Sequence, residues 1–131
     1  MPAFRKPVAP NQDLLIVSDE KTLFEKIADR AIPAEFVHED ELCFAIRDVS
    51  PVAPTHILII PRKPITGINV MDDEDASLVG HLFVTAKHIA EQEGLGSGYR
   101  LVFNVGSDAN QTVPHLHLHL MGGRTFGWPP G

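Results

Sequence analysis

Hydrophobic and polar positions along the chain predict two helices. Residues 22–31 begin with TLFE, which has the spacing of a capping box, and the apolar residues that follow fall on one side of a short helix. From about residue 73 to residue 93, apolar residues recur at three- and four-residue steps, after an acidic start and before Gly94. The stripe of this long helix, which we expect in the core, consists of Leu78, Val79, Leu82, Phe83, Ala86, Ile89 and Ala90.

Shorter apolar runs between turn-forming residues predict the strands. Residues 32–51 are typical of a turn, a short strand, an acidic bend around residues 39–41 and a second strand that stops at Asp48. Residues 56–61 form a β-branched run bounded by prolines, and residues 98–106 and 115–121 predict two more strands. Residues 1–12 contain three prolines and no periodic pattern of apolar residues. We therefore expect a flexible N-terminal arm over residues 1–12, before a single domain over residues 13–131.

Composition narrows the class of protein. A chain of 131 residues is about one domain. Its 11 basic and 17 acidic residues give a formal net charge of -6, which argues against a nucleic-acid-binding protein. Cys43 is the only cysteine, so neither an internal disulfide nor a cysteine-based zinc site can form. No apolar run suits a membrane span or a signal peptide, and we expect a soluble cytoplasmic protein.

The segment PHLHLHLMGG, residues 114–123, carries three of the seven histidines. In a strand, His115, His117 and His119 share one face, and the intervening leucines share the other, which packs. The Cα atoms of His115 and His119 would lie about 13 Å apart, whereas zinc–imidazole bonds are only about 2.0–2.1 Å long, so one strand is a poor three-histidine metal site. A metal site made of two of them and His56 stays open. The histidines could also simply form the polar face of a sheet, without a chemical role, although charged imidazoles side by side would repel one another.

Nucleophilic chemistry is the third interpretation of these histidines. A neutral imidazole, with a reference pKa of about 6.5, is largely unprotonated at pH 7 and can attack phosphorus without a strong base. One ring nitrogen must be held as a donor so that the other is free, and neighbouring donors must stabilise charge on the phosphate oxygens. A row of histidines supplies both kinds of group.

Several segments carry a resemblance to a known family. HLHLHLM matches the signature of the histidine triad superfamily. DVSPVAPTHILIIP (residues 48–61), NVGSDANQTVPHLHLHLMGGR (residues 104–124) and the terminal WPPG resemble its purine nucleoside phosphoramidase branch, usually called Hint. The resemblance runs from about residue 22 to residue 131. It implies an α+β fold with an antiparallel sheet of about five strands and two main helices, paired as a homodimer.

The resemblance implies a role for each group around the phosphate. His117 would be the nucleophile that takes the AMP or GMP group, and the backbone carbonyl of His115 would orient its ring. His119 and His56 would complete the polar surround of the phosphate. The hydroxyl of Thr112 would lie near the leaving amine, at a position where relatives have serine. No metal or other cofactor is implied.

Further residues are implied in substrate binding. Asp48 would accept both ribose hydroxyls, Asn104 would contact the phosphate or the ribose, and Gln111 would lie near the scissile bond. From the residues alone, Asp48 and Asn104 are ordinary turn and loop residues. The apolar slot around the purine would comprise Phe24, Ile27, Val49 and Leu58, which equally suit core packing. Trp128 in the C-terminal tail would reach the active site of the second subunit.

The implied reaction is hydrolysis of purine nucleoside phosphoramidates or acyl-adenylates through a nucleotidyl-histidine intermediate. Two alternatives stay open: a dinucleoside polyphosphate hydrolase of the same superfamily, which the WPPG end disfavours, and a nucleotide-binding regulatory or interaction module with little turnover. The expected partners are purine nucleoside monophosphates, their phosphoramidates and a second copy of the chain, with no nucleic acid and no membrane.

Three residues depart from the family pattern. Asn110 stands where we expect glycine, Pro114 where we expect an aromatic residue, and Pro64 where many members have histidine. Since Pro114 lacks an amide donor and fixes its own φ, the loop before the triad is expected to run differently near the leaving group. The remaining histidines, at positions 38, 81 and 88, are expected on the surface without a role.

Overall fold

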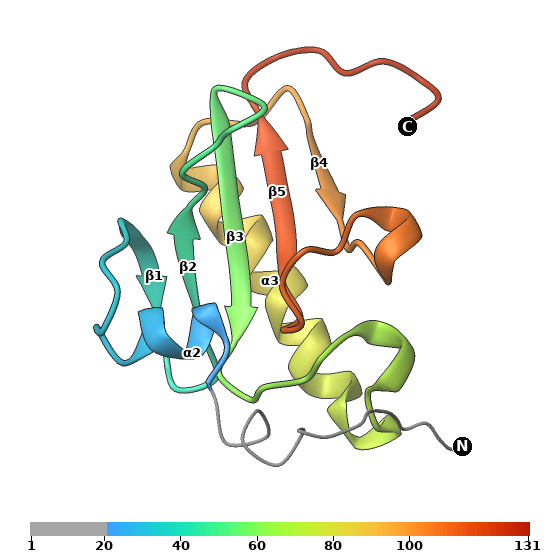
Figure 1. Ribbon diagram of the computed structural model, residues 1–131. Coiled ribbons are helices and arrows are strands. Elements are labelled where there is room, and N and C mark those ends of the chain that lie inside the picture. Colours follow the sequence, from blue (N-terminus) through green and yellow to red (C-terminus); the bar gives the residue numbers. More distant parts are fainter. Residues whose placement is uncertain (1–20) are drawn as a thin grey trace.

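The computed structural model describes residues 21–131, so the expected arm over residues 1–12 lies outside the described residues. A five-stranded sheet forms the centre, in the order β1-β2-β3-β5-β4 (Figure 1), and every neighbouring pair is antiparallel, as predicted. The strands are β1 (Phe36–Glu39), β2 (Cys43–Arg47), β3 (Thr55–Pro61), β4 (Tyr99–Val102) and β5 (Leu118–Gly122). The helical segments are α2 (Leu23–Ala28), α3 (Ala76–Gln92) and three 3-10 turns, η1 (Ile68–Val70), η2 (Asp73–Asp75) and η3 (Ser107–Ala109).

Two apolar clusters cover the opposite faces of the sheet. Alternation along β3 sends Ile57 and Ile59 into the cluster under α3, and Leu58 and Ile60 into the cluster under α2. Figure 1 shows α3 running along one face, with the shorter α2 near the strand ends on the other. Because β3 is buried on both faces, its sequence is a continuous apolar run.

The first helix is shorter than the sequence predicts. Its capping box is present: the Thr22 hydroxyl accepts a hydrogen bond from the Glu25 amide, and the Glu25 carboxylate accepts one from the Thr22 amide. The helix ends at Ala28, and Arg30 follows with a left-handed φ of 64° that stops any continuation. The prediction of two main helices is therefore wrong, because α2 has six residues and α3 has 17.

The apolar stripe of α3 is mostly in the core, as predicted. Leu82, Ala86 and Ile89 are buried against the sheet. Phe83 is an exception, with 40% of its surface exposed and its ring edge-on to Phe103 at 5.7 Å between centroids. Each residue turns about 100° around a helix, so the position after Leu82 lies at the margin of the stripe and not under it.

The histidine segment is a regular strand only in its second half. β5 begins at Leu118, so the prediction of a strand over residues 115–121 is wrong for the first three residues. The His115 amide donates to the Val113 carbonyl, and the Leu116 amide donates to the carbonyl of Ile65, which lies beyond the end of β3. The register pairs Leu118 with Ile59, so the segment leaves the ladder two residues before β3 ends at Pro61, and the Leu116 amide bonds to Ile65 instead.

β4 ends early for the same reason. The register pairs Val102 with His119, so residues 104–106 would need partners that precede β5. The predicted strand over residues 98–106 is accordingly observed only as Tyr99–Val102. None of the helices over residues 21–131 is long and apolar enough to cross a lipid bilayer.

Candidate active site

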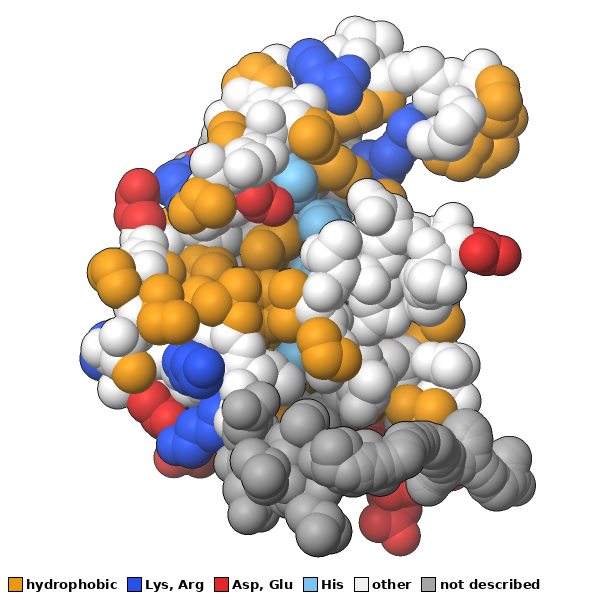
Figure 2. All heavy atoms as spheres, viewed as in Figure 1, with side chains coloured by type: hydrophobic (Ala, Val, Ile, Leu, Met, Phe, Trp, Pro, Cys, Tyr) orange, Lys and Arg blue, Asp and Glu red, His pale blue; other side chains and the backbone are white. Residues whose placement is uncertain are grey.

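The histidines gather on the sheet face opposite α3. In Figure 2, which looks onto this face, their pale blue side chains lie in a hollow beside an apolar area. The three leucines of the segment are buried under α3, so alternation turns the histidines to the other side. His56 of β3 comes from distant sequence and meets His119 because β3 pairs with β5.

His117 has one ring nitrogen fixed and the other available. Its Nδ1–H donates to the carbonyl oxygen of His115 at 2.7 Å, and a carbonyl can only accept, so the proton of the neutral ring is on Nδ1. The Nε2 lone pair is therefore free. Phe24 packs edge-on against the ring, with centroids 5.0 Å apart, and the His117 residue is 7% exposed. This is the arrangement that a nucleophilic imidazole requires.

A chain of hydrogen bonds fixes the tautomers of His56 and His119. The Val52 amide donates to His56 Nδ1 at 3.1 Å, so the His56 proton is on Nε2. That Nε2–H donates to His119 Nδ1 at 2.9 Å, which leaves the proton of neutral His119 on its own Nε2. Among the described residues, this Nε2 is the one buried side-chain nitrogen or oxygen without a hydrogen-bond partner. It is a donor suited to an incoming acceptor such as a phosphate oxygen.

Burial keeps these imidazoles neutral. It lowers the pKa of His117, against an opposing effect of the hydrogen bond to the His115 carbonyl. Burial also lowers the pKa of His56. For His119, burial acts together with repulsion from His117 and His56 and lowers the pKa to about 4. A neutral His117 keeps its lone pair at pH 7, and a neutral His119 avoids charge repulsion beside it.

The ring of His115 supports the site and does not line it. Its Nε2–H donates to the Pro61 carbonyl at 2.8 Å, so its Nδ1 accepts a hydrogen bond from the Thr22 hydroxyl at 2.7 Å. The His115 residue is 1% exposed. It therefore joins α2 to the end of β3, while its backbone carbonyl orients His117.

Asp48 lies beside the histidines at the end of β2. Its Oδ2 is 3.4 Å from His56 Nε2, and its Oδ1 accepts a hydrogen bond from the Ser50 amide in an Asx turn. The turn therefore uses one of the two oxygens that the resemblance implies for the ribose hydroxyls. The Asp48 side chain is 19% exposed, so Oδ2 remains within reach of a ligand.

Three of the four expected slot residues come together. Phe24, Ile27 and Leu58 belong to the cluster under α2, next to the His117 ring. Val49 is 92% exposed and lies outside this cluster. The slot is therefore an edge of the core, consistent with both the packing and the binding interpretations from the sequence.

The polar residues expected to bind substrate in and before this loop differ in exposure and in hydrogen bonding. The Gln111 amide bonds to Gly106, Thr66 and Val113, and so holds the loop to the segment after β3. Thr112 is exposed, and Asn104 is half-buried beyond the end of β4.

Two departures from the family pattern have local explanations. Asn110 has a φ of 63°, in the left-handed region where glycine is common and asparagine is tolerated. Pro114 is the central residue of the tight turn in which the His115 amide bonds to the Val113 carbonyl, and that turn does not use the donor that proline lacks. Pro64 is exposed, and the structure gives no reason for it. In the C-terminal tail, Trp128 is 83% exposed.

One group around this site offers metal-ligand atoms. Atoms of Asp48, His56 and His119 lie within 4.8 Å of one another. A metal ion bound by His56 Nε2 and His119 Nδ1 would have to replace the proton that the two nitrogens share. The sequence left open a metal site made of His56 and two histidines of the triad segment. In the structure, the group with suitable geometry contains only one of those two, His119, together with His56 and the Asp48 carboxylate.

A second polar cluster corrects the expectation for His38 and His81. Both rings bond through Nε2 to the same carboxylate oxygen of Asp40, at 2.7 and 2.8 Å. They are half-buried and join the β1–β2 hairpin to α3. His88 is exposed, as predicted. The sequence offered no signal for this pairing because the two histidines are on different elements, 43 residues apart (81 minus 38).

Known proteins resemble this chain over most of its length. Residues 29–126 match a family model described as HIT domain. An uncharacterised HIT-like protein of Synechococcus elongatus is 55% identical over 112 residues, which cover 86% of this chain and 98% of that protein. A HIT family hydrolase from Legionella pneumophila has a solved structure with 53% identity and a TM-score of 0.83, covering 85% of this chain and 100% of that one. A HIT family hydrolase from Clostridium thermocellum is 40% identical with a TM-score of 0.80, covering 82% and 95%. The chain therefore belongs to the HIT domain family and has the fold of its hydrolases.

Proposed function

We propose that the protein is a purine nucleoside phosphoramidase of the Hint branch, which hydrolyses AMP- or GMP-linked phosphoramidates or acyl-adenylates. The single observation that carries this proposal is the hydrogen bond from His117 Nδ1–H to the His115 carbonyl, because it leaves Nε2 as a neutral nucleophile. The unpartnered donor His119 Nε2–H beside it supports stabilisation of a phosphate oxygen.

The reaction has two displacements at phosphorus. In the first, the His117 Nε2 lone pair forms a bond to phosphorus and the phosphorus–nitrogen bond of the substrate breaks. The departing amine takes a proton from solvent. The family resemblance implies that the exposed Thr112 hydroxyl lies near this amine, where it could relay the proton. In the second, water attacks phosphorus, the bond to His117 breaks, and the water proton returns to solvent. The nucleoside monophosphate leaves, and His117 is neutral again.

The nucleoside half of the substrate would lie between Asp48 and the apolar slot. Asp48 Oδ2 is free to accept from ribose hydroxyls while Oδ1 keeps its turn. The purine would stack on the slot formed by Phe24, Ile27 and Leu58. The buried thiol of Cys43 suits a reducing compartment, so a cytoplasmic location is part of the proposal.

A homodimer is also part of the proposal. β4 is an edge strand of the described sheet, and Tyr99 on it and Phe83 on α3 are each 40% exposed. Pairing of two such edges would cover both aromatic residues and bring the exposed Trp128 of each tail toward the other subunit. We expect light scattering to give the mass of a dimer, and a monomer for Phe83→Glu. A monomeric wild-type protein would contradict the pairing.

The function is tested by AMP release from adenosine phosphoramidate of tryptamine and from diadenosine tetraphosphate, after dialysis against EDTA. We expect fast release from the phosphoramidate alone, and loss of at least about a thousandfold in His117→Asn. His88→Asn, which changes an exposed histidine of α3, is the matched control and should keep full activity.

Each alternative predicts a different result. Faster cleavage of the tetraphosphate identifies a dinucleoside polyphosphate hydrolase. Tight AMP binding without turnover of either compound identifies a nucleotide-binding module. Activity that is lost with EDTA and restored by zinc identifies a metal site at Asp48, His56 and His119.

A further inference from the structure

A cavity separate from the histidine site lies at the end of the sheet, between the α3–β4 loop and the C-terminal tail. Its volume is about 540 Å³. The loop and the start of β4 contribute Ser97, Tyr99 and Arg100 to its lining, and the tail contributes Arg124, Thr125 and Phe126. Figure 2 shows Lys or Arg side chains in this region, at the upper end of the hollow that holds the histidines and below the C-terminal tail.

The two arginines of this cavity share one aromatic ring. The Arg100 guanidinium carbon lies 4.9 Å from the centre of the Phe126 ring, and that of Arg124 lies 4.2 Å from it. Their hydrogen bonds go to backbone carbonyls: Arg100 donates to Gly127, and Arg124 donates to Val52 and Thr125. Two positive charges are therefore held close together by neutral groups.

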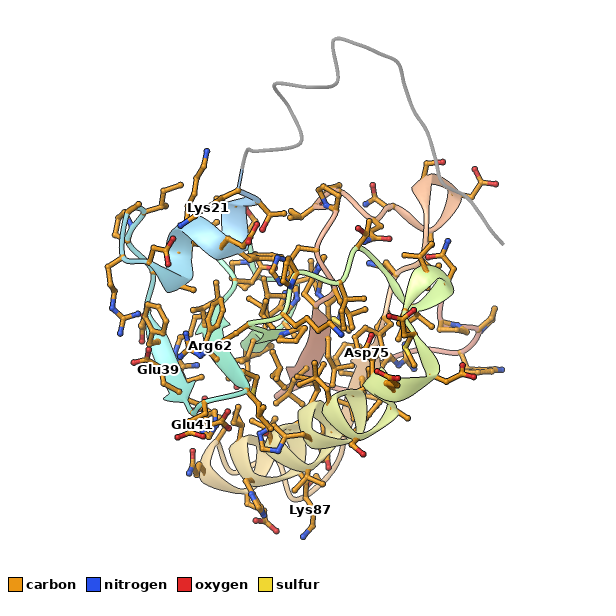
Figure 3. All side chains as sticks on the ribbon, turned by 90° about the horizontal axis from the view of Figure 1, so that it is seen from below. Lys21, Glu39, Glu41, Arg62, Asp75 and Lys87 are labelled. Carbon is orange, nitrogen blue, oxygen red and sulfur yellow. The ribbon has the colours of Figure 1, made fainter. Side chains whose placement is uncertain are left out.

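The other described arginines have carboxylate partners. Arg30 and Arg62 both pair with Glu39 and each lies over a phenylalanine ring, and Figure 3 shows Arg62 beside Glu39 on the hairpin. Arg47 pairs with Glu35 and Glu93. Within residues 21–131, only Arg100 and Arg124 among the five arginines lack a carboxylate within salt-bridge distance.

The sheet register places Arg100 on the face of the catalytic histidines. Arg100 pairs with Met121, and Met121 pairs with His56, so these three residues form one row across β4, β5 and β3. The next row on the same face contains His119. Diagonal neighbours in antiparallel sheets lie about 7–8 Å apart, which puts Arg100 within the length of a substrate from the phosphate site.

We propose that this cavity is an oxyanion-binding subsite for the leaving group of the substrate. This inference rests on the proposed function. It predicts that the preferred substrates have a leaving amine that carries a phosphate or a carboxylate. A guanidinium presents paired N–H donors that match the oxygens of either group, and charge-assisted hydrogen bonds of this kind are stronger than neutral ones. Arg100 uses one of its five donors, so the others are available.

Matched substrate pairs test the subsite. The first pair links AMP through nitrogen to tryptophan or to tryptamine, which differ by a carboxylate. The second links AMP to phosphoethanolamine or to ethanolamine, which differ by a phosphate. We expect Arg100→Gln to lower kcat/KM at least about tenfold for the anionic member and less than about twofold for the neutral member.

The two pairs also identify the oxyanion, because the larger loss marks the group that the cavity prefers. Arg100→Lys, which keeps the charge, should recover part of the loss. Arg30→Gln is the control, since that arginine also lies over a phenylalanine ring but has a carboxylate partner. Equal losses for neutral and anionic members, or no loss for either, would overturn the subsite.

A binding experiment separates this inference from the proposed function. If the wild-type protein cleaves no phosphoramidate, the proposed function fails, and the subsite is then tested by calorimetric titration with pyrophosphate in the presence of AMP. Weakening of at least about tenfold in Arg100→Gln supports the subsite. Equal affinity of the two proteins, or no binding by either, overturns it.

Discussion

At the scale of single residues, the site depends on which nitrogen of each imidazole carries the proton. The Val52 amide determines this for His56, His56 determines it for His119, and the His115 carbonyl determines it for His117. Two of these three determinants are backbone groups. Hydrogen bonds thus leave a neutral donor, His119 Nε2–H, beside a neutral ring nitrogen of His117 with a free lone pair.

The lowered pKa of His117 predicts that the proposed activity tolerates mild acid. The proposed nucleophile can attack only when neutral, so a pKa below the ordinary 6.5 keeps it neutral at pH values where a free imidazole is already half protonated. We predict that kcat/KM for an adenosine phosphoramidate stays constant as the pH falls through 6.5 and decreases only at lower pH. If activity were instead half lost at or above pH 6.5, burial would not be what controls the pKa of the His117 ring.

The sequence predicted the chemistry of the residues better than their surroundings. Spacing alone identified the imidazoles and their shared face, because side-chain direction follows from the strand period. The hydrogen bonds of Gln111 and the shared partner of His38 and His81 depend on contacts between distant elements, which no local pattern encodes.

At the scale of elements, Thr22 connects a helix cap to the candidate active site. Its hydroxyl accepts from the Glu25 amide at the start of α2 and donates to His115 Nδ1. The position of α2, which carries Phe24 and Ile27 to the slot, thus depends on the same oxygen as the orientation of the His115 ring. A six-residue helix has little stability of its own, so these contacts matter.

Removal of this hydroxyl should reduce stability. We predict that Thr22→Val lowers the free energy of unfolding by about 1–2 kcal/mol, since the cap and the partner of His115 are both lost. Thr22→Ser, which keeps the oxygen, should stay within about 0.5 kcal/mol of the wild type. Urea denaturation followed by circular dichroism measures both. A loss in Thr22→Ser that equals or exceeds the loss in Thr22→Val would contradict this role of the hydroxyl, because serine keeps the oxygen and lacks only the methyl group.

Asp40 is the other link between elements. Burial acts to raise the pKa of Asp40, but hydrogen bonds from His38, His81 and the amides of Cys43 and Leu42 outweigh it and hold the pKa well below its ordinary 3.8. The carboxylate thus ties the hairpin turn to α3. Because its pKa is lowered on folding, its contribution to stability is present above pH 3.8 and is lost as the pH falls further.

We predict that Asp40→Asn lowers the free energy of unfolding by about 1–3 kcal/mol at neutral pH, since a charged acceptor of hydrogen bonds from two imidazoles and two backbone amides becomes a neutral amide. The gap to the wild type should narrow as the pH falls below 3.8. Urea titrations at several pH values measure this, with His88→Asn as the control on an exposed histidine. A gap that is independent of pH would exclude the carboxylate charge as its origin.

The elements themselves were largely predictable, and their ends were not. The capping box and the apolar run of β3 are local signals, and both elements formed where predicted. β5 starts three residues late because the Leu116 amide bonds to Ile65, beyond the end of β3, and α2 stops early because Arg30 turns into the left-handed region. Both ends depend on tertiary context and on backbone angles that propensity does not fix.

At the scale of the whole molecule, the two faces of the sheet differ: one packs against α3, and the other carries the candidate active site. The face under α3 holds the larger apolar cluster, with three leucines of the triad segment, and the opposite face holds the histidines, the slot and Asp48. Alternation along one short segment thus supplies both the core and the site. The sequence could predict this division because it is periodic, whereas the cavity with Arg100 and Arg124 arises only when the tail folds back over β4.

The central claim is that His117 becomes covalently bound to the nucleotide. Intact-protein mass spectrometry after rapid mixing with an adenosine phosphoramidate tests it most directly, with His117→Gly as the comparison. The account predicts a wild-type species heavier by one adenylyl group, which forms within a turnover, decays to free AMP and is absent from the variant. Release of AMP without any adduct on the wild-type protein, or an adduct that persists in His117→Gly, would contradict it.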